Sequence, residues 1–117
     1  MNILPEQFFA ALSHPIRLRC LLLLHRHEEL CVCELTQVVG AAQPTMSRHL
    51  GQLRALGLVA DRRDGLWIHY RIASELPVQI RRLLDTAASE LFALSPFKED
   101  AATLEGMQLR RSDSRCA

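Results

Sequence analysis

One feature constrains the fold more than any other, namely a helical segment that runs directly into a hairpin. Residues 43–56 begin with Gln-Pro and follow helical periodicity, and Gly57 stands where a helix commonly ends. Two stretches with strand character follow, 58–63 and 66–72, joined by Asp64-Gly65, a dipeptide typical of a tight turn. We therefore expect a helix followed at once by a two-stranded hairpin.

Further helices are expected on both sides of this unit. Periodicity predicts a short helix over 5–13, a second over 15–26, a third of about eight residues that stops at Gly40, and a long one from about Glu75 to Leu94 that Ser74 can cap. The second is too apolar to be solvated and should be the central core helix. The long helix carries an apolar stripe that a small domain leaves unpartnered, so it should pack against another copy of the chain.

This layout predicts a fold that is mainly α with a β-hairpin wing. A helix, a short turn, a second helix with a polar face and then a hairpin are the parts of a winged helix-turn-helix. We expect it to dimerise through its terminal helices. The predicted domain spans residues 1–95, and residues 96–117 are predicted to be a mobile C-terminal extension.

Charge patterning points to a polyanion as the partner. The formal net charge of the 117 residues is only +1, yet residues 43–72 hold five Arg against two Asp. All basic residues except Lys98 are arginines, whose planar guanidinium suits phosphates and base edges. Near-neutrality is therefore an average over a basic middle segment and two mildly acidic flanks.

The outer face of the 43–56 helix could enter a DNA major groove. Arg48 and Gln52 can make bidentate contacts to base edges, and Gly51 permits close approach. A merely solvated helix face would accommodate the same residue types. The candidate DNA-binding residues on this helix and at the hairpin are Gln43, Thr45, Ser47, Arg48, His49, Gln52, Arg62 and Arg63.

Two cysteines at the start of the third helix form the second unusual feature. Cys31 and Cys33 lie near unpaired backbone N–H groups and the positive end of the helix dipole, which favours thiolates that bind soft ions. A lone Cys-x-Cys is weak for zinc, whereas trivalent arsenic or antimony needs at most three sulfurs. The alternative is a pair of buried apolar cysteines, which fits poorly with Glu29 and Glu34 on either side.

Four runs of sequence carry a specific resemblance. They read Glu-Leu-Cys-Val-Cys-Glu-Leu over 29–35, Gln-Pro-Thr-Met-Ser-Arg-His-Leu over 43–50, Leu-Arg-x-x-Gly-Leu-Val over 53–59, and Asp-Arg-Arg-Asp-Gly-Leu-Trp-Ile-His-Tyr-Arg over 61–71. Across about residues 5–95 the chain resembles the arsenic-responsive repressors of the ArsR/SmtB family. The resemblance implies a homodimer that binds a palindromic double-stranded DNA operator and leaves it when arsenite, an organoarsenical or antimonite binds.

The resemblance also implies a ligand set. Cys31 and Cys33 match the two thiolates of the family's Cys-Val-Cys box, but Thr36 stands where a third cysteine is common. Cys116, from the same chain or its partner, is the candidate third ligand, and Cys20 is expected to be a core cysteine. The ligands of the family's zinc, cadmium and lead sensors are missing from the expected segments.

Other function classes fit less well. The N-terminus lacks the pattern of a secretory signal, and the longest apolar run, 20–24, is far below the ~20 residues that span a bilayer, so we expect a cytoplasmic protein without membrane contact. We expect no catalytic residues and no organic cofactor. The enzyme alternative is an arsenate reductase, which would need a loop that holds an oxyanion beside its reactive cysteine, and the segment around Cys31 has no such loop. A repressor that responds to thiol oxidation or to another soft metal is the main alternative. A purely structural dimerisation module leaves the basic segment and the cysteine pair unexplained.

Overall fold

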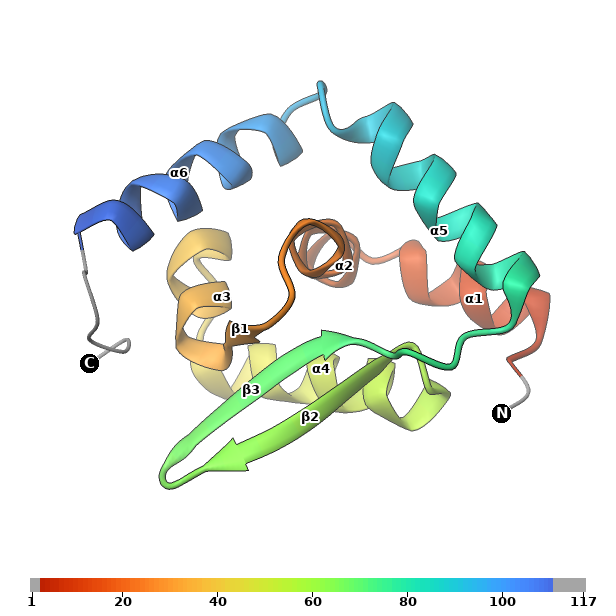
Figure 1. Ribbon diagram of the computed structural model, residues 1–117, viewed down its shortest axis with the longest axis horizontal. Helices are drawn as coiled ribbons and strands as arrows, with labels where there is room; N and C mark the ends of the chain where they lie inside the picture. Colours follow the sequence, from red (N-terminus) through yellow and green to blue (C-terminus); the bar gives the residue numbers. More distant parts are fainter. Residues whose placement is uncertain (1–2, 111–117) are drawn as a thin grey trace.

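The computed structural model describes residues 3–110, which form several helices and a small three-stranded sheet at one edge of the molecule (Figure 1). The elements in chain order are α1 (Pro5–Leu12), α2 (Pro15–Arg26), β1 (Leu30–Cys31), α3 (Val32–Val39), α4 (Gln43–Leu56), β2 (Val59–Asp64), β3 (Trp67–Ile72), α5 (Val78–Leu91) and α6 (Phe97–Arg110). The sheet is antiparallel with the order β1-β3-β2. The prediction of a mainly α fold with a β-hairpin is therefore confirmed.

The ends of the helices follow local sequence signals. His14 caps α2, its Nδ1 accepting a hydrogen bond from the Ile16 N–H at 3.1 Å. Gly40 and Gly57 end α3 and α4 with φ angles of 82° and 87°, a left-handed conformation that glycine adopts without a steric cost. These signals explain why the predicted bounds of α2 and α4 match the observed ones.

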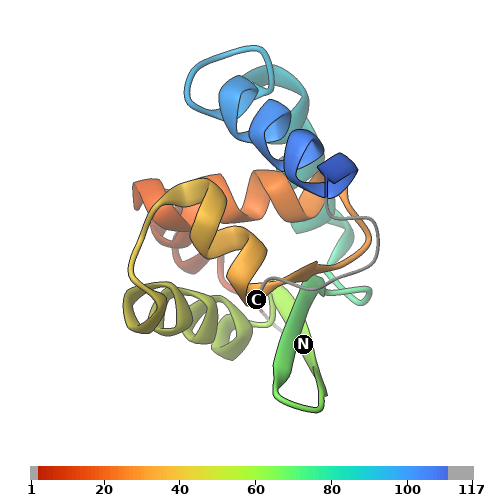
Figure 2. The same ribbon diagram turned by 90° about the vertical axis from the view of Figure 1, so that its left-hand side faces the viewer.

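The apolar helix α2 lies at the centre of the molecule, with the other elements around it (Figures 1 and 2). Its residues 20–24 are all buried, and Cys20, Leu21, Leu23 and Leu24 belong to one hydrophobic cluster with buried leucines of α3, α4 and α5. The expectation of a central core helix is thus confirmed. No helix within residues 3–110 has the length and apolar character needed to cross a membrane.

The predicted helix over 75–94 is wrong at both ends, because the observed helix is shorter and ends at Leu91. Helix α5 begins only at Val78, and its N-cap is Pro77 rather than Ser74. Proline disfavours the helical conformation in the residue before it, which excludes Leu76 from the helix. The hairpin strands also shift slightly, since Leu66 belongs to the turn and is 92% exposed.

Two elements lack any counterpart in the predicted set. Strand β1 precedes α3 and pairs with β3, with Leu30 opposite Tyr70 and Cys31 opposite His69. Helix α6 occupies much of the segment expected to be a mobile extension, and it packs on α2 and α3. Its buried Ala101 and Leu104 face the core. The division of the chain at residue 95 stays a prediction.

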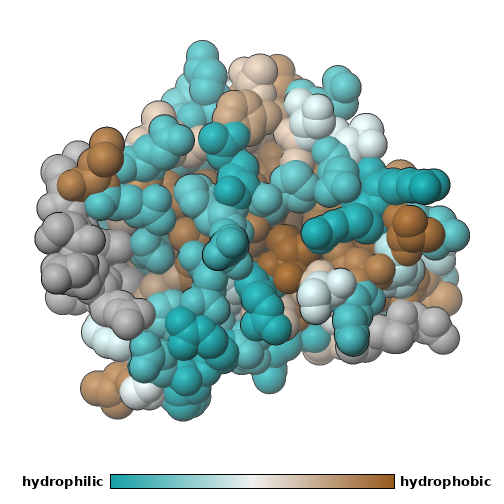
Figure 3. All heavy atoms as spheres, viewed as in Figure 1, coloured by the Kyte–Doolittle hydropathy of each residue, from teal (hydrophilic) through white to brown (hydrophobic). Residues whose placement is uncertain are grey.

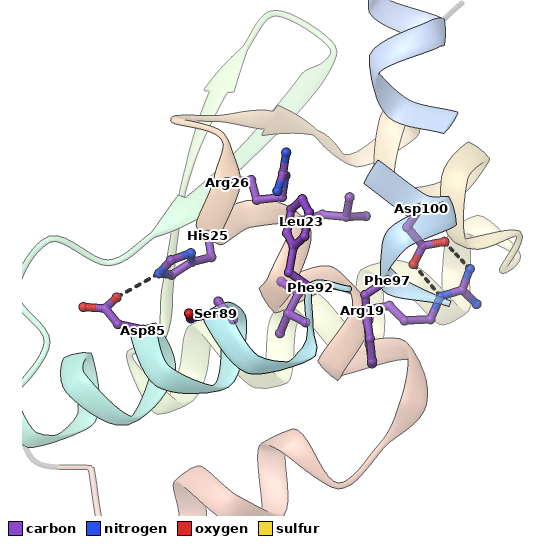
Figure 4. Close-up of a pocket in the computed structure, with 11 residues that line it drawn as sticks. Arg19, Leu23, His25, Arg26, Asp85, Ser89, Phe92, Phe97 and Asp100 are labelled. Carbon is purple, nitrogen blue, oxygen red and sulfur yellow. Dashed lines mark hydrogen bonds and ion pairs between the residues drawn. The ribbon is translucent and has the colours of Figure 1, made fainter. Parts of the chain in front are cut away.

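A buried ion pair anchors α6. Arg19 of α2 donates two hydrogen bonds to the carboxylate of Asp100, at 2.8 and 2.7 Å, and Asp100 is almost fully buried. This pair lines a cleft of about 370 Å³ between α2, α5 and α6, at whose other end His25 and Asp85 are 2.8 Å apart (Figure 4). Charge-assisted, bidentate pairs of this kind fix the position of the elements they join.

Candidate DNA-binding face and sulfur pair

Helix α4 presents two chemically different faces. Met46, Leu50 and Leu53 are fully buried on the inner side. Exposed on the outer side are the predicted DNA-binding residues Gln43, Ser47, Arg48 and Gln52, with Thr45 half-buried. These residues lie on the side of α4 away from the buried ones, so the outer side carries several polar side chains and a cationic one.

The hairpin lies on the same side of the molecule as α4 (Figure 2). Arg62 and Arg63 are both exposed on β2. Arg62 is already engaged within the protein, because its Nε and Nη2 donate to the two carboxylate oxygens of Glu29 at 2.8 and 2.7 Å. The hydrogen bond from Arg62 holds the pKa of Glu29 below its ordinary value. The two hairpin arginines therefore differ in their surroundings.

His49 does not lie on the outer face of α4. It is only 5% exposed, its ring lies 4.2 Å from that of His14, and its Nδ1 is 3.2 Å from Nη1 of Arg17. Burial, with a further contribution from the neighbouring basic side chains of His14, Arg17 and Arg48, lowers the pKa of His49. The structure thus removes His49 from the surface that was predicted to contact DNA.

Arg17 is a residue whose role the sequence did not reveal. Its guanidinium donates to the carbonyl oxygens of Ala10 and Ala11 at the end of α1, at 3.2 and 3.0 Å. It also donates to Oε1 of Gln52 at 2.9 Å. Arg17 therefore fixes the orientation of a side chain on the outer face of α4 and ties that helix to α1. A lone arginine at the edge of a core helix gives no sequence signal for such a role.

The two cysteines of the Cys-Val-Cys run come together at the junction of β1 and α3. Their Sγ atoms are 2.9 Å apart. Cys31 is the N-cap of α3 and is 2% exposed, whereas Cys33 is half-buried. The N–H of Cys31 donates to Oε1 of Glu34 at 2.9 Å, an interaction that closes the first turn of the helix. Two soft donors at a helix N-terminus are suited to an electron-poor thiophilic ion.

The other two cysteines differ. Cys20 is fully buried in α2, its thiol donates to Sδ of Met46 at 3.3 Å, and burial raises its pKa to about 12. This environment agrees with the expected core role. Cys116 lies outside the described residues. Within residues 3–110 no group of three or more His, Cys, Asp or Glu side chains could hold a metal ion.

Comparison with known proteins agrees with this geometry. A family model described as bacterial regulatory protein, arsR family, matches residues 14–61. This range includes Cys31, Cys33 and all of α2 through α4. The arsenical resistance operon repressor of Escherichia coli (strain K12) is 42% identical over 85 residues, which cover 73% of either chain. The chain belongs to the arsR family. Arsenic resistance transcriptional regulator ArsR2 of Pseudomonas putida is 40% identical over 113 residues, covering 97% of this chain and 92% of the relative.

Solved structures confirm the winged-helix fold. The transcriptional repressor BigR from Xylella fastidiosa is 34% identical with a TM-score of 0.61, and the match covers 74% of this chain and 85% of that one. The AntR antimony-specific transcriptional repressor is 28% identical with a TM-score of 0.60, over 78% of this chain and 85% of that one. Proteins of this family are DNA-binding transcriptional regulators.

Proposed function

We propose that this protein represses an arsenical-resistance operon and leaves its operator when trivalent arsenic or antimony binds Cys31 and Cys33. The observation that carries the proposal is the 2.9 Å separation of the two sulfurs at the N-terminus of α3, the helix that packs on α4. Arsenical-resistance repressors among the relatives and an antimony-specific repressor among the similar structures support the choice of ion.

The DNA-binding face consists of α4 and the hairpin. Helix α4 enters a major groove of ~12 Å, where Arg48 and Gln52 contact base edges and the smaller polar side chains contact phosphates. Arg62 and Arg63 then reach the backbone or the adjacent minor groove from the wing. The basic segment found in the sequence supplies the attraction to the polyanion.

A palindromic operator requires a twofold protein, and the exposed apolar residues support a homodimer. Leu4 and Phe9 near and in α1, and Val78 and Leu83 in α5, are between 41% and 56% exposed. Figure 3 shows apolar surface among polar atoms at the end of the face where α1 and the start of α5 lie. Sedimentation equilibrium should give twice the 13.2 kDa mass of one chain, and a mass of 13.2 kDa would contradict the dimer.

The Cys31 and Cys33 sulfurs are soft donors and lie close enough together to bind one trivalent arsenic or antimony ion. Such an ion takes up to three sulfur ligands in a pyramidal arrangement, and in the reduced protein Cys31 and Cys33 would supply two of them. Cys31 is shared between β1 and α3, so any change in its position acts on the first turn of α3. Helix α3 packs on α4, and a shift there misplaces the DNA-facing residues. A coupling of about 1–3 kcal/mol per site weakens DNA binding by about 5–150-fold.

The proposal is tested with the full chain, a fluorescent operator duplex and fluorescence anisotropy. We expect tight binding that arsenite weakens by about 5–150-fold under reducing conditions. Scrambled DNA of the same length is the control for sequence-independent attraction. Operator affinity that is the same with and without arsenite would reject the inducer assignment.

The third ligand is tested separately. We propose that Cys116 completes the site, from the same chain or the partner. X-ray absorption at the arsenic edge should count three sulfurs in the wild-type complex and two in Cys116→Ser. An unchanged sulfur count in Cys116→Ser would exclude Cys116 as a ligand.

The short sulfur-to-sulfur distance also favours a second candidate, a redox-responsive repressor. Starting from the reduced protein, two-electron oxidation of Cys31 and Cys33 by peroxide would form one S–S bond between them, reduce the peroxide to water and release DNA. Peroxide should then release the operator at doses where arsenite does not. Release by arsenite in the presence of a strong reductant selects the arsenic-responsive function instead.

A further inference from the structure

We propose that Glu29 couples the Cys31–Cys33 sulfur pair to the wing, so that an ion on the sulfurs alters the hairpin as well as α3. The inference rests on the proposed function and adds a second path from the site to the DNA. The proposed connection is a row of side chains across the three-stranded sheet, which ends in the Glu29–Arg62 ion pair.

Strand β1 places the sulfur site in the same sheet as the wing. Cys31 lies opposite His69 of β3, and His69 lies opposite Arg62 of β2. Side chains of directly opposite residues in an antiparallel sheet project from the same face. Cys31, His69 and Arg62 therefore form one row, from the buried strand that leads into α3 to the exposed strand of the hairpin.

Glu29 joins the two ends of this row. It precedes Cys31 by two residues, a spacing that puts both side chains on the same side of an extended segment. Its carboxylate accepts the two hydrogen bonds from Arg62, and its Oε1 lies 3.9 Å from Nδ1 of His69. A displacement of Cys31 thus carries Glu29 with it and pulls on the two strands of the wing at once.

The chain contains its own reporter of the wing. Trp67 is the single tryptophan, and it stands at the start of β3, opposite Asp64 at the hairpin end. Its side chain is half-buried and packs against the core. Tryptophan emission therefore reports on this strand of the hairpin in the absence of DNA.

The experiment titrates the reduced full-length protein with sodium arsenite while Trp67 emission is recorded, and bound arsenic per chain is counted after ultrafiltration. We expect a saturable change in the wild-type emission. Glu29→Gln and Arg62→Gln, which each remove one charge of the pair, should bind the same amount of arsenic and lose most of that change. The two losses should not add in the double variant, because both substitutions break one interaction.

Glu28→Gln is the matched control, since Glu28 is the exposed neighbour and should keep the full emission change. Wild-type arsenic binding without an emission change, or an undiminished change in Glu29→Gln, would overturn the coupling. Neither readout involves DNA, so a failure to release the operator rejects the proposed function and leaves this result in place. Absence of bound arsenic in the wild type would overturn both.

Discussion

At the residue scale, His49 was predicted to lie on the surface that contacts DNA, but its side chain is buried in the fold. It is one of the predicted DNA-binding residues of α4, and it follows Arg48 in the sequence. In the fold it turns inward and meets Arg17 and His14 instead. A neutral imidazole can accept from the Arg17 guanidinium, whereas an imidazolium cannot. The inward position therefore favours the neutral form.

This environment predicts acid sensitivity. Burial holds the pKa of folded His49 below its ordinary value of 6.5, so the unfolded chain binds a proton that the folded chain does not. Stability then falls as the pH drops below about 6.5. His49→Gln keeps an acceptor for Arg17 and should lose less stability between about pH 7 and 5 in urea unfolding.

The free energy of unfolding of His49→Gln should still fall somewhat between about pH 7 and 5, because burial also lowers the pKa of His27. An equally steep fall in His49→Gln and in the wild type would show that His49 does not cause the acid sensitivity.

At the element scale, α4 combines a packed inner face with an outer face that is smooth around Gly51. No atom outside its own helix backbone and chain neighbours lies within 4 Å of the position a Cβ would take there. A methyl group therefore fits in the unbound protein. Glycine within a helix costs stability relative to alanine, which makes its presence on this face a candidate for close approach to DNA.

Gly51→Ala should separate stability from DNA binding. The variant should gain roughly 0.5–1 kcal/mol in the free energy of unfolding. Operator affinity should fall about tenfold, the equivalent of ~1.4 kcal/mol, if the methyl group enters the DNA contact. Urea unfolding and fluorescence anisotropy measure the two effects. A more stable variant with unchanged operator affinity would show that this part of α4 does not approach DNA.

The buried Arg19–Asp100 ion pair anchors helix α6, and Asp100→Asn tests that role. The substitution keeps the shape of the side chain but leaves Arg19 without its anionic partner. We expect a loss of about 1–3 kcal/mol in the free energy of unfolding and faster hydrogen exchange in α6.

Asp85→Asn is the matched control, because the partly exposed pair with His25 should contribute less than about 1 kcal/mol. Equal losses in the two variants, or α6 exchange that stays slow in Asp100→Asn, would refute the anchoring role.

At the scale of the whole molecule, the features that could be predicted from the sequence are those that depend on residues close together in the chain. Gly57 and Asp64-Gly65 marked the helix end and the hairpin, and the resemblance marked the cysteine pair. The missed features depend on residues far apart in the chain. The Arg19–Asp100 pair that holds α6 spans 81 positions, and the Glu29–Arg62 pair spans 33. Neither pairing has a periodic pattern, and strand β1 has only two residues, too few to show alternation.

The pairing of β1 with β3 places the sulfur pair at a junction of two elements. The sulfur pair lies between α3, which packs on α4, and β1, which pairs with the hairpin. Both parts of the proposed DNA-binding face therefore connect to Cys31 through the elements that flank it. In the proposed mechanism a small ion acts on a much larger surface because its proposed ligands stand at that junction.

The most direct test of the central claim is arsenite-dependent operator binding by Cys31→Ser/Cys33→Ser, measured by fluorescence anisotropy beside Cys20→Ala. The double variant should bind the operator as the wild type does and keep that affinity when arsenite is added. Cys20→Ala, which lacks only the buried core thiol, should still lose operator affinity by about 5–150-fold. Release of the double variant by arsenite would contradict the assignment of Cys31 and Cys33 as the sensor.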